Sequence, residues 1–312
     1  MAIKTRLKPL TRLKTPSEHP ATGVILVALG ALGFSSTIFF ARSVVGMDAF
    51  MLACFRAWAS FLFFCVMLPR HPHTLRPRAY RREWGWLLLM GVTVGATGML
   101  YIYAVQHTTA ANAVLLNNTS TLYVALLAPL LLREPRPRYA TVSLVLAMVG
   151  IVGITNSGNA APRVGNLSGG LAALLGGVTL AMTILISRHL RGRVGGLTQI
   201  WWSTGIAALM ALPWGLGVTR EQLAVNYAPL IASGVLGHGV PYLLYFLGLQ
   251  RAPAQVVGIV ALLEPVSGVL MGILLYHEVP TLVSLLGIVL ILTSIVLVSQ
   301  KRSPVLPVKG VY

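Results

Sequence analysis

Residues 130–134 read Leu-Leu-Leu-Arg-Glu, and residues 274–278, 144 positions further along, read Leu-Leu-Tyr-His-Glu. In both copies an apolar run ends in a glutamate, and a proline follows within two residues. The same offset places Tyr101-Ile-Tyr-Ala-Val-Gln106 on Tyr245-Phe-Leu-Gly-Leu-Gln250. At an offset of 146, further matches place Gly23, Gly30 and Arg42 on Gly169, Gly176 and Arg188. Single matches are common in apolar sequence, but their shared spacing indicates an internal duplication.

Long apolar segments make up most of the chain. It has 312 residues, of which 56% are hydrophobic and 10% charged, whereas soluble domains carry about 25% charged residues. A membrane-spanning helix needs about 20 mostly apolar residues. Ten such segments are found, at 21–41, 49–69, 84–105, 109–132, 138–156, 167–187, 196–217, 228–249, 254–276 and 280–300. The alternative is eight or nine spans, with a short segment lying in the membrane interface.

The basic residues test this division, because Lys and Arg collect in cytoplasmic loops. With a cytoplasmic N-terminus, 20 of the 24 Lys and Arg residues fall in cytoplasmic segments. Only Arg42, Arg163 and Arg220 fall outside, and Arg56 lies within a span. The net charge of +17 therefore reflects membrane topology rather than nucleic-acid binding, since no continuous basic stripe exists. Ten spans with both termini in the cytoplasm are predicted.

The duplication divides these spans into two units of five. Because five is odd, the second unit must enter the membrane upside down, an arrangement typical of secondary transporters. The predicted fold is thus an all-α integral membrane protein with ten transmembrane helices in two inverted five-helix repeats. The predicted boundaries are a cytoplasmic tail at 1–20, repeats at 21–156 and 157–300, and a second cytoplasmic tail at 301–312.

The chain resembles the EamA family of the drug/metabolite transporter superfamily. The resemblance rests on the two helix endings at Glu134 and Glu278, on Gly287 in the following helix, and on Arg56 and Glu264-Pro265. In one departure, Thr121 stands where the first repeat of the family often has a proline, which predicts a fourth helix that is more polar and less kinked. The resemblance implies export of amino acids and other metabolites from bacteria, near the exporters of aromatic amino acids. It also implies a central cavity lined by the first, third, fourth, sixth, eighth and ninth helices.

Two formal charges lie deep within the predicted spans, Arg56 and Glu264. Such groups are costly at membrane depth and usually face a cavity. Glu264 is expected to bind a cationic group or to take up a proton. Proton uptake is favoured because a carboxyl group without water favours its neutral form. Arg56 is expected to contact substrate or a gate. The alternative for Glu264 is a fixed ion pair or a hydrogen-bonded helix strut, and the alternative for Arg56 is structural pairing to a neighbouring helix.

Helix interruptions point to the same region. Gly237, His238, Gly239 and Pro241 interrupt the eighth span, Pro265 interrupts the ninth, and Gly95 lies in the third. Breaks of this kind mark transporter binding sites, although small residues also permit close helix packing. His238 is a candidate for the cavity.

Further polar and aromatic residues complete the predicted site. Four tyrosines lie on spans that the duplication relates, and tyrosines in a wet cavity can stack on flat substrates. Tyrosines near a helix end can equally belong to the interfacial belt. The candidates are Tyr101, Tyr103, Tyr242 and Tyr245, together with Asn118 and Ser120 from the polar run at 117–121.

Missing motifs narrow the function. No G-x-x-x-x-G-K-[ST] loop is present, and His277-Glu278 lacks the second histidine of H-E-x-x-H. No enzyme activity, cofactor or metal is predicted. The expected function is secondary transport of small molecules, most directly export of amino acids across the bacterial inner membrane by alternating access. The alternatives are a permease for drugs, nucleotide sugars or lipids, a channel, or an intramembrane enzyme. The expected partners are the substrate and membrane lipids, with the chain a monomer or a homodimer through the fifth and tenth helices.

Overall fold

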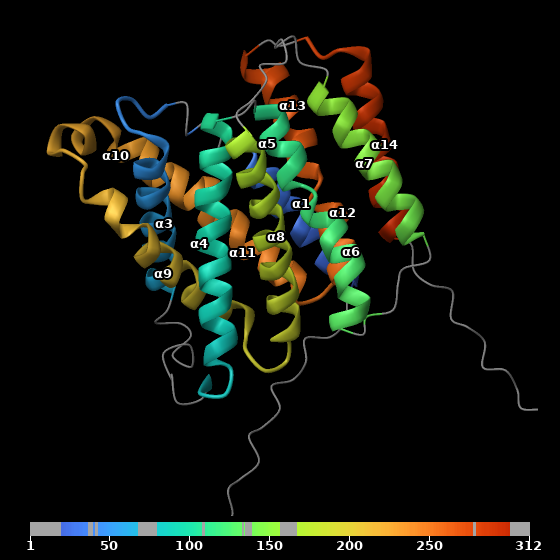
Figure 1. Cartoon of the computed structure of the whole chain (residues 1–312), viewed down its shortest axis with the longest axis horizontal. Coiled ribbons are helices and arrows are strands. Elements are labelled where there is room, and N and C mark those ends of the chain that lie inside the picture. The colour runs from blue at the N-terminus through green and yellow to red at the C-terminus, as the bar shows by residue number, and fades with distance from the viewer. Residues whose placement is uncertain are drawn as a thin grey trace, which may run out of the picture.

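A computed structural model describes residues 20–36, 40, 43–67, 80–107, 110–132, 134, 139–156, 167–276 and 279–299. Across these residues the chain is helical (Figure 1). The first half contains α1 (Pro20–Phe34), α3 (Ala49–Met67), α4 (Trp84–His107), α5 (Ala110–Asn117), α6 (Ser120–Leu131) and α7 (Ala140–Asn156). The second half contains α8 (Leu167–His189), α9 (Gly196–Gly215), α10 (Arg220–Gly234), the π-helical turn η4 (Val235–Gly239), α11 (Val240–Leu249), α12 (Ala254–Val260), α13 (Leu263–Tyr276) and α14 (Leu282–Ser299).

These elements form ten spans within the described ranges, as the apolar segments predict. The fourth span consists of α5 and α6, the eighth of α10, η4 and α11, and the ninth of α12 and α13. Six helical stretches are each long and apolar enough to cross a membrane by themselves, and three shorter apolar helices accompany them. The fold is therefore an all-helical, multi-pass membrane protein.

The eighth helical stretch begins earlier than its predicted start at residue 228. It begins at Arg220 and continues to Leu249, because Thr219 and Gln222 form a reciprocal capping box at its N-terminus. The apolar pattern misses this first turn because its residues are polar.

The main helix contacts between the two halves are symmetric: replacing each helix by its counterpart in the other half gives the same contacts. α4 of the first half packs on α8 of the second, and the corresponding α11 of the second half packs on α1 of the first. Two further pairs, α3 with α9 and α7 with α14, each join one half to the other. Figure 1 shows α7 and α14 side by side at one edge, with α3, α9 and α10 at the opposite edge.

Residues matched by the duplication make matching contacts. A Cβ on Gly30 of α1 would come within 3.0 Å of the Tyr245 nitrogen, and a Cβ on Gly176 of α8 would lie 3.8 Å from the Tyr101 nitrogen. Gly30 corresponds to Gly176, and Tyr245 corresponds to Tyr101. Arg42 and Glu278, the counterparts of Arg188 and Glu134, lie outside the described residues, as do residues 1–19 and 301–312 of the predicted tails. Pro20 instead begins α1.

Packing within the molecule is uneven along the spans. One large apolar cluster extends through α4, α8, α11 and α12, and it includes Leu190, Val194, Leu249 and Ala252, none more than 1% exposed. These residues adjoin the face that carries Arg81, Arg82, Arg188, Arg191, Arg193 and Arg251, called the basic face below. Toward the opposite end, a small separate cluster consists of Ala104, Ala113, Ala172 and Ala173.

Candidate functional site

A cavity of about 180 Å³ lies among the spans, between the two halves. An apolar cavity of about 150 Å³ holds a benzene molecule, so this one accommodates a small metabolite. It is lined by residues of all six helices that the family resemblance implies, and α3 adds Arg56.

Eight of the nine predicted site residues line this cavity: Arg56, Tyr101, Asn118, Ser120, His238, Tyr242, Tyr245 and Glu264. The ninth, Tyr103, is not among the lining residues. Its ring stacks on that of His107 with centroids 3.8 Å apart, and it lies 6.3 Å from Phe50. Tyr101 and Tyr103 are two positions apart on one helix, so they point to different sides.

The predicted helix interruptions take three forms. Gly237 and Gly239 belong to the π-helical turn η4, which the Val240 N–H closes by donating to the Val235 carbonyl, and Pro241 follows in the first turn of α11. Single π turns within helices often occur at functional sites, and His238 lies in this one. Pro265 lies in the first turn of α13. Gly95 instead faces Ala207 and Met210 of α9.

The fourth and ninth spans are both broken at the depth of the cavity. Residues 118–119 separate α5 from α6, and residues 261–262 separate α12 from α13. In the fourth span, Asn118 Nδ2 donates to the Val114 carbonyl at 2.9 Å, and the Thr119 hydroxyl donates to the Leu116 carbonyl at 2.5 Å. Side chains that bond the preceding backbone in this way compete with helix continuation. In the ninth, the Glu264 N–H donates to the Ala261 carbonyl at 3.0 Å, so Glu264 is placed at the break.

One wall of the cavity is aromatic. The rings of His238 and Tyr242 stack with centroids 4.7 Å apart, and Tyr242 lies 4.7 Å from Phe246. Phe34 of α1 contacts Tyr242 and Tyr245 edge to face at 6.0 and 6.2 Å. This wall offers ring faces and edges to a flat or apolar group.

Hydroxyl and amide groups form the other wall. Thr97 of α4 bonds Thr179 of α8 at 2.7 Å, and Thr183 donates to Thr93 at 2.8 Å. Thr121 donates to the Gly258 carbonyl at 3.1 Å. Phe34, Thr97 and Thr183 also line the cavity, and the sequence does not predict this, because a single residue in a long apolar helix carries no sign of the face it occupies.

Asn117 lies beside this polar wall. It belongs to the polar run at 117–121, from which Asn118 and Ser120 were preferred. Its Oδ1 atom is buried without a hydrogen-bond partner among the described residues. This oxygen lies against α8, because a Cβ on Gly176 would come within 3.0 Å of it.

Two opposite charges share the cavity without forming an ion pair. The Arg56 guanidinium and the Glu264 carboxylate interact electrostatically, and Tyr101 lies close enough to interact with both. Neither side chain makes a hydrogen bond or salt bridge with another described residue. The structural alternative for these residues, a fixed ion pair, is thus not observed within the described part of the chain.

Comparisons with known proteins agree with this architecture. The model of the EamA-like transporter family matches residues 21–156 and 167–300. An uncharacterized transporter of Bacillus subtilis (YxxF) is 22% identical over 92% of both chains. Human solute carrier family 35 member G1 is 25% identical over 89% of this chain and 78% of its own length.

Two further similarities bear on function and fold. The threonine/homoserine exporter RhtA of Escherichia coli is 30% identical over 65% of this chain and 66% of its own length. A solved crystal structure, 18% identical, superposes with a TM-score of 0.73 over 89% of this chain and 97% of the other, which shows the shared fold. With both halves matched by one family model and relatives named as transporters, the chain belongs to the EamA-like transporter family, of the drug/metabolite transporter type.

Proposed function

We propose that this protein is a secondary transporter that exports small zwitterionic metabolites, most directly amino acids, by alternating access. The observation that carries the proposal is the pair Arg56 and Glu264, two opposite charges that line one cavity without an ion pair between them. Charged groups at membrane depth are retained where they serve a pathway or a ligand.

A zwitterion matches this pair of charges. Its carboxylate can accept two parallel hydrogen bonds from the Arg56 guanidinium, and its ammonium can donate to Glu264. The substrate side chain then lies against the aromatic wall of Tyr242 and Phe246. The relative named as a threonine/homoserine exporter supports an amino-acid substrate.

Alternating access follows from the pairing of the two halves. We infer that they are inverted repeats, because each holds five spans and the helix contacts survive their exchange. If the halves exchange conformations, a cavity closed toward one side becomes closed toward the other. The distribution of basic residues supports cytoplasmic termini.

Counter-flow in proteoliposomes tests the proposal. Vesicles preloaded with unlabelled amino acid should take up the radiolabelled compound saturably, which a channel does not support, and should release it chemically unchanged, unlike an enzyme. Glu264→Gln should lower this exchange at least about tenfold with or without a pH gradient, because the ammonium loses its counter-charge.

The matched control is Glu83→Gln, which removes a carboxylate at the basic face that pairs with the half-exposed Arg193. It should exchange like the wild type. A loss in Glu264→Gln that is confined to vesicles with a pH gradient would assign Glu264 to proton coupling instead.

A second candidate follows from the aromatic wall, which also suits flat apolar compounds and thus a drug or other metabolite permease. Folded protein that exchanges no amino acid but exchanges an aromatic cation would favour this alternative.

A further inference from the structure

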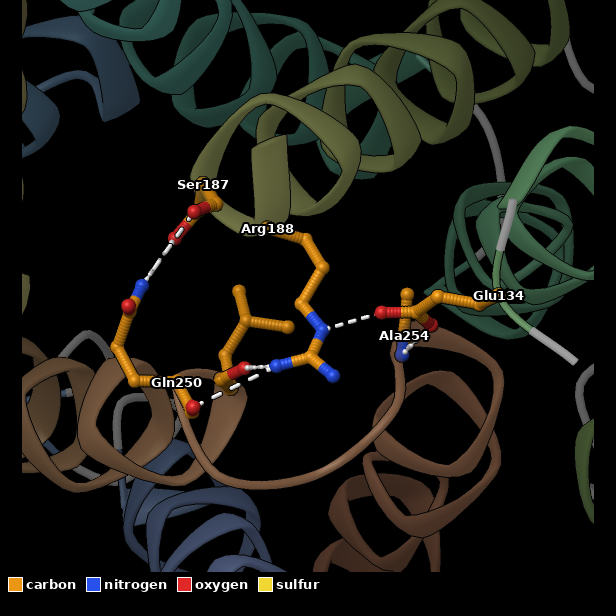
Figure 2. A network of polar contacts seen from close by, with 6 residues as sticks. Glu134, Ser187, Arg188, Gln250 and Ala254 are labelled. Carbon is orange, nitrogen blue, oxygen red and sulfur yellow. Dashed lines mark hydrogen bonds and ion pairs between the residues drawn. The ribbon is translucent and has the colours of Figure 1, made fainter. Parts of the chain in front are cut away.

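A buried ion pair joins the two halves of the molecule at the basic face. Glu134, which follows α6 in the first half, accepts from Arg188 Nε at 2.5 Å, at the end of α8 in the second half. The two side chains are 15% and 7% exposed. Figure 2 shows both reaching toward the turn between α11 and α12.

Each charge also binds the backbone of that turn. Arg188 Nη1 donates to the carbonyls of Leu249 and Gln250 at 3.2 and 3.4 Å, where α11 ends. Glu134 Oε2 accepts from the Ala254 N–H at 2.9 Å, where α12 begins. A cation at a helix C-terminus and an anion at an N-terminus are both favourable. The turn at 250–253 is thus held from both sides.

The second half extends this network. Gln250 Nε2 donates to the carbonyl and hydroxyl oxygens of Ser187 at 3.3 and 3.4 Å (Figure 2). The Ser187 hydroxyl donates to Gln199 of α9 at 2.6 Å. Glu134 is the member of this network that comes from the first half.

The Glu134–Arg188 ion pair also holds together α6 and α12, which both extend between the helix breaks and the basic face. α6 packs along α12, where Thr121 bonds the Gly258 carbonyl at 3.1 Å and Gln255 Nε2 bonds the Ala125 carbonyl at 3.0 Å. When the halves are exchanged, α6 corresponds to α13 and α12 corresponds to α5, so the matching contact would lie between α5 and α13. Within the described ranges those two helices share no comparable packing. Together with the burial of Leu190, Val194, Leu249 and Ala252 beside the basic face, this asymmetry indicates tighter packing between the cavity and that face than toward the opposite one.

The free energy of a buried ion pair is consistent with a contact that opens and closes. Burying two charges costs desolvation energy that largely offsets their attraction, so a buried pair adds little net stability. Losing one partner, by contrast, leaves an unpaired buried charge. A pair at the rim of the membrane can instead expose both members to water together, which restores their hydration.

We propose that Glu134 and Arg188 form a latch that closes the cavity toward the basic face, and that the structure represents the latched state. This inference rests on the proposed function as a carrier. Opening separates α6 from the turn at 250–253 and hydrates both charges.

Thiol accessibility tests the latch without any substrate. The reporter is Gly98→Cys in a chain whose Cys54 and Cys65 are replaced by alanine. Gly98 lines the cavity, and its added Cβ would meet only Arg56 Nη2, at 3.9 Å. A membrane-impermeant maleimide is applied to one side of oriented proteoliposomes at a time.

Glu134→Gln and Arg188→Gln should each speed labelling from the basic face about tenfold, corresponding to about 1.4 kcal/mol, and slow it from the opposite face. Arg188→Lys should give a smaller change, because lysine keeps the charge but not the planar fork. Glu83→Gln, which breaks the exposed Glu83–Arg193 pair at the same face, should change neither rate.

Labelling that is unchanged, or that rises equally from both faces in folded variants, would overturn the latch. Glu134→Gln retains an oxygen to accept the Ala254 N–H, so it is the variant expected to fold. Failure of both substitutions to fold would identify the pair as a structural strut. Because no substrate is present, a protein that gates in this way but exchanges no amino acid would sink the transport proposal alone.

Discussion

Arg56→Gln is expected to lower the apparent affinity for a zwitterionic substrate about a hundredfold, the largest functional effect of a single substitution in this chain. Truncating one partner of a desolvated charge pair costs about 2–5 kcal/mol, and a hundredfold change corresponds to about 2.7 kcal/mol. The guanidinium has no other hydrogen-bond or salt-bridge partner among the described residues, so its loss should leave the fold intact. Concentration-dependent counter-flow measures the effect.

Substrate analogues separate this role from a structural one. An amine that lacks the carboxylate should bind weakly to the wild type and no more weakly to Arg56→Gln, because both changes remove the same contact. Arg193→Gln, at the exposed end of its pair with Glu83, is the matched control and should behave as wild type. An equal loss for substrate and amine would show that Arg56 does not bind the carboxylate.

The charged part of the site could be predicted from the sequence for a simple physical reason. Ionisable groups are rare at membrane depth, so Arg56 and Glu264 stand out in any apolar span. Threonines do not stand out, because a threonine can bond the backbone of its own helix. Thr97 and Thr183 do so, bonding the Thr93 and Thr179 carbonyls while they also line the cavity. Tyr103 shows the converse, since it lies two positions from Tyr101 on the same helix and is not among the residues that line the cavity.

The fold could be predicted because the lengths of the apolar segments and the positions of the basic loops can both be read along the sequence, without knowledge of contacts between distant residues. Pro265 marks the break in the ninth span, but the fourth span is broken at residues 118–119 although Thr121, in place of a proline, predicts a less kinked helix there. The side chains of Asn118 and Thr119 bond the preceding backbone at this break, and the apolar pattern does not show such bonds. The polar first turn of α10 was not, because it depends on the contact between Thr219 and Gln222.

Contacts between residues that are far apart in the sequence could not be predicted in this way. Glu134 and Arg188 were each visible as charges at the ends of spans, and both match a residue in the other half. Their sequence separation of 54 residues says nothing about contact. Only the packing of α6 and α8 brings them together around the turn at 250–253.

The packing of α7 on α14 leads to the largest expected effect on stability. A Cβ on Gly287 would lie 2.5 Å from the Gly150 carbonyl oxygen and 3.1 Å from the Ile154 nitrogen, and a Cβ on Gly150 would lie 2.6 Å from the Gly287 carbonyl oxygen. Backbone atoms cannot yield as a flexible side chain does, so the two helices must separate along their crossing. Overpacking of this kind costs about 1–3 kcal/mol. Gly287→Val should therefore lower the midpoint of thermal unfolding in detergent by about 5 °C.

The reciprocity of this contact makes the prediction sharper. Gly150→Val should destabilise about as much as Gly287→Val, and the double variant should cost less than the sum, because helices already forced apart admit the second side chain. Gly268→Val is the control, since nothing lies within 4 Å of its added Cβ. The cavity lining includes no described residue of α7 or α14, so exchange per folded molecule should be preserved in the Gly150 and Gly287 variants. Full additivity would show that the two glycines do not share one crossing. A loss of exchange in stable, folded Gly287→Val would show instead that this peripheral pair moves during transport.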